Sequence, residues 1–117
     1  MHLTTLGALG RLGLRIANNV LSLAGNLVFT TAAAGVTFKQ GANGRVGTFT
    51  CDGTTPVVVA NTSVAITDTI VFSLNTVGGT VGAIPTIKTI TASTGFTVAG
   101  SASDTSIYNY TILKNAA

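Results

Sequence analysis

The sequence predicts an all-β fold, an antiparallel β-sandwich of jelly-roll-like type with a short extended N-terminal arm. Short apolar runs alternate with a period of two along most of the chain. Turn-forming residues separate these runs roughly every 8–12 residues. No segment shows the 3.6-residue apolar period of an amphipathic helix. Strands that follow one another without intervening helices form sandwiches or jelly rolls rather than parallel βαβ units.

The first 17 residues differ from the rest of the chain. Leucine and glycine each recur there at every third position, at Leu3, Leu6, Leu9 and Leu12 and at Gly7, Gly10 and Gly13. Each interior glycine costs a helix about 1 kcal/mol relative to alanine, and no capping box precedes the run. We therefore predict an extended arm over residues 1–17 and a β-sandwich domain over residues 18–117. The alternative is an arm that frays or forms a first, poorly alternating strand.

Apolar alternation gives a series of expected strands after the arm. Pro56 opens a run that fits a buried or an edge strand, and the Asn43-Gly44 pair favours the positive φ angles of a tight hairpin. The clearest strand is 66–74, in which the large apolar side chains share one parity. The expected strands are 12–16, 20–23, 27–29, 36–38, 45–51, 57–59, 66–74, 84–91, 96–98 and 107–113.

Charged residues make up only 8% of the chain, whereas about a quarter is typical of globular proteins. Threonine, alanine, glycine and serine replace them, and the mean hydropathy of +0.58 argues against disorder. A neutral, hydroxyl-rich surface gives a free monomer low solubility, because solubility depends on interspersed surface charge. We therefore expect a subunit whose faces are covered by copies of itself or by a larger assembly.

The positive charge does not indicate a nucleic-acid partner. Nucleic-acid binders gather basic residues on one face, usually beside aromatic side chains. Only Arg11 and Arg15 lie close together here.

Both arginines lie within the apolar N-terminal stretch rather than ahead of it, so we expect no cleaved signal. No uninterrupted apolar run reaches the roughly 18 residues of a membrane-spanning helix, and we expect no membrane partner.

Groups for catalysis are scarce in the sequence, which predicts a non-enzymatic protein. The single histidine is His2, and glutamate is absent. Asp52, Asp68 and Asp104 stand beside Gly, Thr or Ser, a context in which a carboxylate accepts backbone N–H groups of a turn. These residues form no zinc or calcium motif, so we expect no metal and no cofactor. The glycine-rich stretch 77–82 lacks the Lys-Ser/Thr of a phosphate loop and is interpreted as a loop.

Three further side chains have alternative interpretations. Cys51 is the only cysteine and fits a small apolar filler, with an intermolecular disulfide as the alternative. Tyr108 and Tyr110 share one face of the last strand. They fit cross-strand packing or a subunit interface better than a sugar-binding platform.

Residues 47–113 resemble a β-domain of virion structural proteins in tailed bacteriophages. The likeness lies in five stretches, Gly47–Thr50, Thr55–Ala60, Thr76–Thr80, Thr94–Gly100 and Asp104–Tyr110. The resemblance implies a sandwich module that associates as a trimer, at the end of a fibre or as a knob on the virion.

From this resemblance we expect a homotrimeric capsid decoration (cement) protein on the outer surface of the phage head. Its arm would lie across the major capsid protein, with apolar and basic contacts from Leu6, Leu9, Arg11, Leu12 and Arg15. The alternative is a tail- or head-fibre tip that recognises host glycans through loops such as Gln40–Gly44 or Gly78–Ala83. A third possibility is a scaffold module with no role in the virion.

Overall fold

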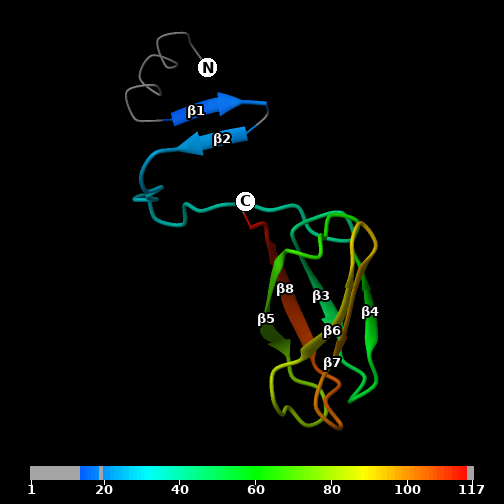
Figure 1. The fold of residues 1–117 in the computed structure, drawn as a ribbon. Coiled ribbons are helices and arrows are strands. Elements are labelled where there is room, and N and C mark those ends of the chain that lie inside the picture. Colours follow the sequence, from blue (N-terminus) through cyan, green and yellow to red (C-terminus); the bar gives the residue numbers. More distant parts are fainter. Residues whose placement is uncertain (1–13, 19, 116–117) are drawn as a thin grey trace. The chain divides into compact units, whose positions relative to one another are not determined.

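The computed structural model describes residues 14–18 and 20–115, and these residues form eight strands and no helix (Figure 1). The chain divides into two compact units, Met1–Val36 and Thr37–Ala117. The predicted division into an arm over residues 1–17 and a sandwich domain over 18–117 stays a prediction. The strands are β1 (Leu14–Ala17), β2 (Val20–Leu23), β3 (Val46–Thr50), β4 (Val57–Ala60), β5 (Thr69–Thr76), β6 (Thr86–Thr91), β7 (Gly95–Ala99) and β8 (Ile107–Leu113).

The first unit contains a short antiparallel hairpin of β1 and β2. Ala17 pairs with Val20, and the turn residue Asn18 has a φ of 51°, a conformation that asparagine tolerates well. All four side chains of β2 are exposed. Residues 1–13 of the predicted arm lie outside the described residues.

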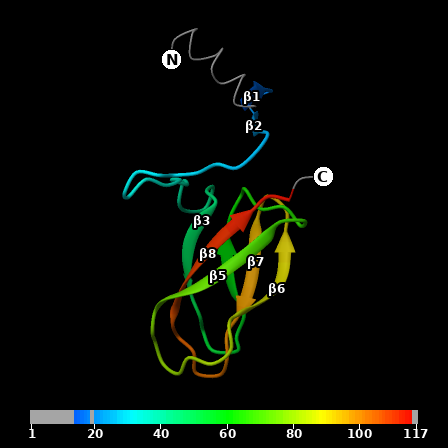
Figure 2. The ribbon, with the colours of Figure 1, turned by 90° about the vertical axis from the view of Figure 1, so that its left-hand side faces the viewer.

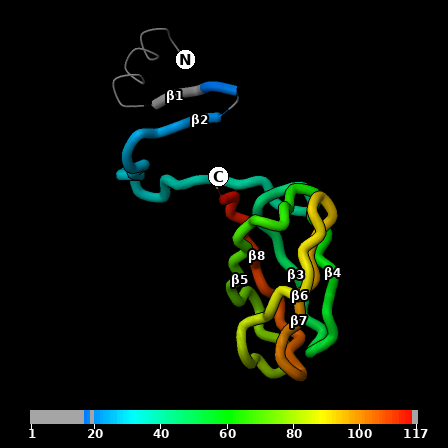
Figure 3. Tube along the Cα trace, in the orientation of Figure 1, coloured from blue at the N-terminus to red at the C-terminus, as the bar shows by residue number. Residues whose placement is uncertain are grey.

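The second unit is an antiparallel β-sandwich, which confirms the predicted fold class. One sheet has the strand order β3-β8-β5 and the other β4-β7-β6. The sheets form the two layers seen in Figure 2. The chain crosses from one sheet to the other four times, and only β6 and β7 follow each other within a sheet (Figure 3). No helix in the described part of the chain is long and apolar enough to cross a membrane.

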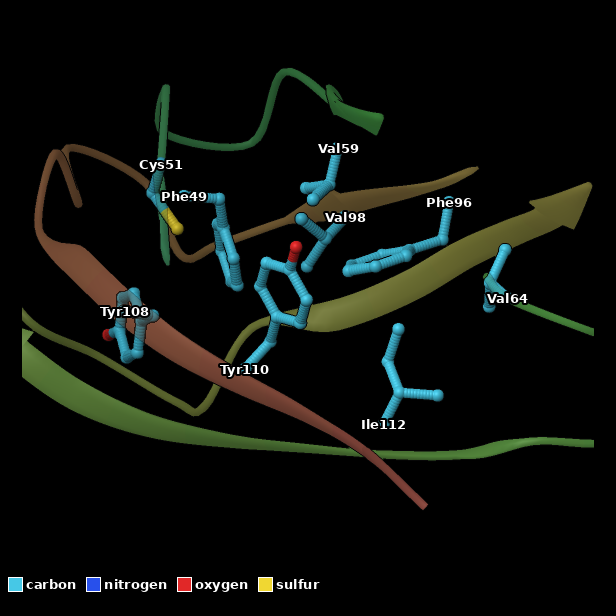
Figure 4. Packing of buried hydrophobic residues seen from close by; sticks show 9 residues of the cluster. All are labelled: Phe49, Cys51, Val59, Val64, Phe96, Val98, Tyr108, Tyr110 and Ile112. Carbon is cyan, nitrogen blue, oxygen red and sulfur yellow. The ribbon is translucent and has the colours of Figure 1, made fainter. Parts of the chain in front are cut away.

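The core lies between the two sheets and follows the pleat of the strands. In β8 the residues alternate between half-buried and buried, with Tyr108, Tyr110 and Ile112 facing inward. Phe96 of β7 contacts Tyr110 edge-on, with the ring centroids 5.3 Å apart. Figure 4 shows these side chains with the rest of the buried cluster, Phe49, Cys51, Val59, Val64 and Val98.

Two strand predictions are wrong. Leu27–Phe29 and Val36–Phe38 have apolar strand patterns but form no strand. A strand requires a neighbour for its backbone groups, and no strand pairs with either segment. The predicted strand 66–74 begins later, at Thr69, because Asp68 N–H donates to the Ala65 carbonyl in a turn.

Candidate functional site

The outer surface of sheet β3-β8-β5 carries a row of neutral polar side chains. Because strand side chains alternate between faces, the residues between the inward-facing ones of each strand point outward. Thr48, Asn109 and Ser73 lie opposite one another in one row across the three strands. Together with neighbours on the same face they form the surface that we call the polar face, namely Thr48, Ser73, Asn75, Asn109 and Thr111.

Side-chain hydrogen bonds connect the polar face. The Asn109 amide donates to Ser73 Oγ at 3.2 Å, and the Asn75 amide donates to Asn109 Oδ1 at 2.8 Å. Each amide carries both donors and acceptors, so it orients its neighbours and still has capacity for a ligand. No charged side chain belongs to this face.

The polar face contains a hollow of about 330 Å³, to which the loop before β3 also contributes. The hollow offers amide and hydroxyl groups rather than ionisable ones, so its chemistry favours a neutral polar ligand over an anion or a metal ion. Its lining comprises Gln40, Val46, Gly47, Thr48, Ser73, Asn109, Tyr110 and Thr111.

Buried Asn61 fixes the loop that carries Gln40. The Asn61 amide donates to the Gly44 carbonyl at 2.9 Å and to Tyr110 Oη at 3.2 Å. Its Oδ1 accepts from the backbone N–H of Ser63 at 2.9 Å and from the Ser63 hydroxyl at 2.7 Å. Gly44 admits no side chain, since a Cβ there would lie 2.1 Å from the Lys39 carbonyl oxygen. The loop is therefore held rigidly beside the hollow.

A second buried polar cluster holds the opposite end of the sandwich. The Asp104 carboxylate accepts from the Ser106 N–H at 2.9 Å and from the Tyr108 hydroxyl at 2.7 Å. Hydrogen bonds from Ser106, which outweigh the effect of burial, and then from Tyr108 hold the pKa of Asp104 below its ordinary value. Ser106 Oγ also exchanges hydrogen bonds with Gly78. This fixes the loop between β5 and β6 against the start of β8.

The stability of the sandwich is expected to fall as the pH rises from about 10 to about 12. Burial, and then the hydrogen bond to Asp104, raise the pKa of Tyr108 from 10.0 to about 12. Between these values the unfolded chain has lost the phenolic proton that the folded chain keeps, so ionisation favours unfolding. Urea unfolding followed from pH 9 to 12 measures the decline.

A Tyr108→Phe variant is the control for this pH dependence. It is expected to be less stable at neutral pH but to lose less stability between pH 10 and 12 than the original chain. An equal decline in both proteins would contradict the assignment to Tyr108.

The structure places the side chains singled out from the sequence in different settings. Tyr108 and Tyr110 are each only 3% exposed and pack within the core, although Tyr110 also borders the hollow; their expected role at a subunit interface stays a prediction. Within the single chain they pack across strands, Tyr108 on Phe49 and Tyr110 on Phe96. Cys51 is free and buried and fills the core as predicted. The turn role is confirmed for Asp104 and for Asp68, whose carboxylate accepts from Ala65 N–H at 2.8 Å.

Other predicted contacts fall outside this site. Arm residues 6, 9, 11 and 12 precede the described residues, and Arg15 is described only as part of β1. Of the two loops expected to contact glycans, Gln40–Gly44 borders the hollow. The other, Gly78–Ala83, is fixed against Ser101–Thr105 by its backbone. Among the residues that the structure describes, no three His, Cys, Asp or Glu side chains gather as metal ligands do.

Comparison with known proteins then decides the family. A family model matches residues 43–113, more than half of the chain, and its description is K1 capsule-specific polysaccharide lyase, C-terminal domain. The chain belongs to this family. No match was found among curated proteins or among solved structures.

The family match covers the part of the chain that forms the sandwich. It begins in the loop before β3 and ends at Leu113, the last residue of β8. It therefore includes both sheets and every residue of the polar face. It also coincides with residues 47–113, which resemble phage virion domains, and is compatible with a phage structural domain. The signal that sequence reasoning missed is the row of polar residues at the outward parity of β3, β5 and β8.

Proposed function

We propose that this chain is a non-enzymatic module of a phage virion, of the tail- or head-fibre type, that contacts a host-surface polysaccharide through the polar face. The observation that carries the proposal is the family match over residues 43–113 combined with a neutral amide and hydroxyl surface within that range. Sugar hydroxyls are both donors and acceptors, and asparagine and threonine side chains complement them in both roles.

The absence of an aromatic side chain on the polar face bears on affinity. Stacking of a ring on a sugar would add apolar contact area, which hydroxyls and amides do not supply. We infer that one copy binds weakly and that a homotrimer gains affinity because several copies engage one polymer. The low charge of the chain supports such self-association.

The family match supports the fibre alternative better than the capsid decoration protein. The model is that of a C-terminal domain of a polysaccharide lyase, and nothing in its name concerns a capsid. The decoration hypothesis depends on arm contacts at residues 6–15, of which 6–13 lie outside the described residues. Copy number in purified particles separates the two, because a decoration protein is present in hundreds of copies and a fibre protein in far fewer.

Replacement of Asn109 by alanine is expected to weaken binding to purified K1 capsular polysaccharide about tenfold, because the loss of one or two hydrogen bonds is worth roughly 1.4 kcal/mol. Asn109 is half-buried and lines the hollow, and its side chain bonds only to the exposed Ser73 and Asn75, so the fold tolerates the change. Biolayer interferometry with immobilised polysaccharide measures the effect.

The matched control is Thr97→Ala on the outer face of the other sheet, where Thr97 pairs with Thr89 at 2.7 Å. Its binding is expected to equal that of the original chain. Equal binding by all three proteins would exclude the polar face. Cleavage of the polysaccharide by the original chain would overturn the non-enzymatic part of the proposal.

A further inference from the structure

The sandwich has an open edge with a deep groove between β3 and β4. Each of these strands ends its sheet, with a neighbour on one side only. The groove has a volume of about 480 Å³. Consecutive residues of both strands line it, Gly47–Thr50 on one wall and Val57–Ala60 on the other. It adjoins the polar face, with which it shares Thr48.

The backbone groups of both walls point into this edge. Cys51 N–H donates to the Ser106 carbonyl on the β8 side. In an antiparallel ladder such bonding alternates along the strand, so Thr48 and Thr50 direct their N–H and C=O groups away from β8. The same argument applies to β4, where Asn61 N–H donates to the Thr94 carbonyl. Val58 and Ala60 therefore present their backbone groups at the edge.

The turn before β3 already uses free backbone groups of this edge. Gly41 N–H donates to the Val46 carbonyl at 3.0 Å, on the free side of β3. The next residue, Ala42, accepts from Thr62 N–H at 2.6 Å, directly after β4. Two consecutive residues thus bond both walls at one end of the groove. The backbone groups of Thr48 and Ala60, further along the groove, remain available to an extended segment.

A segment suited to this groove lies earlier in the same sequence. Leu27, Val28 and Phe29 have a strand pattern but no strand partner, and they are 67%, 69% and 47% exposed. No charged residue occurs between positions 16 and 38, so burial of the segment desolvates no ion. Its three residues match the three from Thr48 to Thr50 in length.

We propose that Leu27–Phe29 of one copy adds as a short strand in the β3/β4 groove of a second copy. The inference rests on the self-association in the proposed function and identifies its contact surface. Leu27 and Phe29 then face the inside of the groove, whose lining includes Phe49 and Val59, and Val28 faces outward.

Reach and symmetry favour a neighbouring copy as the source of the strand. The chain from Phe29 to Gln40 spans up to roughly 35 Å when extended, enough to cross to an adjacent sandwich. Each copy carries one segment and one groove, so head-to-tail exchange gives a ring when the rotation between copies closes and an open filament when it does not.

The test measures the mass of the full-length protein by light scattering after size-exclusion chromatography. The original chain is expected to be an oligomer, and the double variant Leu27→Ser/Phe29→Ser a monomer with an unchanged melting temperature of the sandwich. The matched control Val28→Ser is expected to stay oligomeric, with less than a threefold change in dissociation constant.

A second variant addresses the groove instead of the segment. Val58→Pro removes an N–H that β7 does not use, so β4 keeps its place in the sheet while addition at its free edge is blocked. It is expected to be monomeric, whereas Val58→Thr is expected to remain oligomeric.

The outcomes separate this inference from the proposed function. An oligomer that persists in Leu27→Ser/Phe29→Ser overturns strand addition, while self-association and polysaccharide binding stand. A monomeric original chain overturns both strand addition between copies and the homotrimer. A monomer in which the amides of Thr48 and Ala60 exchange slowly, and faster in the double variant, assigns the groove to the same chain's own segment and also overturns exchange between copies.

Discussion

Replacement of Asp104 by alanine is expected to lower the melting temperature of the sandwich by on the order of 10–20 °C. Asp104 is fully buried, and its carboxylate is the acceptor for the Tyr108 hydroxyl and the Ser106 N–H. Alanine leaves both donors buried without a partner, and an unsatisfied buried group costs more than the net value of the bond it lost. Differential scanning calorimetry at neutral pH measures the effect.

Two variants test the cause of this loss. Asp52→Ala removes an exposed aspartate from a neighbouring turn and is expected to change the melting temperature by only about 2 °C. Tyr108→Phe removes one of the two donors together with its need for an acceptor, so it is expected to cost less than Asp104→Ala. A loss in Tyr108→Phe as large as in Asp104→Ala would show that ring packing, not the carboxylate, dominates.

The Asp104 carboxylate is also expected to make the free energy of unfolding decrease as the pH falls into the acid range. Because the pKa of Asp104 is lowered in the folded state, the unfolded chain binds a proton first as the pH falls. Its contribution is therefore present above the unfolded pKa of about 3.9 and is lost as the pH falls through the folded pKa. Asp104→Asn is expected to flatten this decline in urea unfolding between pH 5 and 2.

The strands of the sandwich are predictable where alternation is strong. In 107–113 the inward positions are Tyr, Tyr and Ile, and this segment became β8, the central strand of its sheet. At Leu27–Phe29 the pattern gave a wrong strand prediction. Alternation indicates that one face of a segment is suited to burial, but it does not show whether the same chain supplies a neighbouring strand. If Leu27–Phe29 pairs with a second copy, the sequence correctly indicated a strand whose pairing partner lies in another chain.

The polar parts of the structure were harder to predict. The context of Asp104 identified a turn carboxylate, yet nothing local distinguishes it from exposed Asp52. Only the fold brings the Tyr108 hydroxyl and Gly78 to that turn from separate elements. The polar face has the same origin, because Thr48, Ser73 and Asn109 become neighbours through strand register. Register is set by pairing across the chain and is not visible in any one segment.

Replacement of Asn61 by alanine is expected to lower the free energy of unfolding by about 2–4 kcal/mol. Asn61 is fully buried and makes hydrogen bonds as donor to Gly44 and Tyr110 and as acceptor from Ser63. The variant leaves these groups buried without their hydrogen-bond partner, at the end of the sandwich opposite Asp104. Guanidinium unfolding monitored by tyrosine fluorescence gives the free energy from the shifted midpoint.

Asn61→Ala also tests whether the loop before β3 contributes to polysaccharide binding as well as to stability. Asn61 holds this loop, and the loop places Gln40 beside the hollow on the polar face. Asn61→Ala is therefore expected to weaken polysaccharide binding at temperatures where the sandwich is still folded. The control Asn75→Ala removes an exposed asparagine amide from the polar face without touching the loop, so it is expected to leave the unfolding free energy within about 0.5 kcal/mol. If Asn61→Ala unfolds more readily yet binds the polysaccharide normally, the loop contributes to the fold and not to the ligand site. Recognition would then depend on the strand residues of the polar face alone.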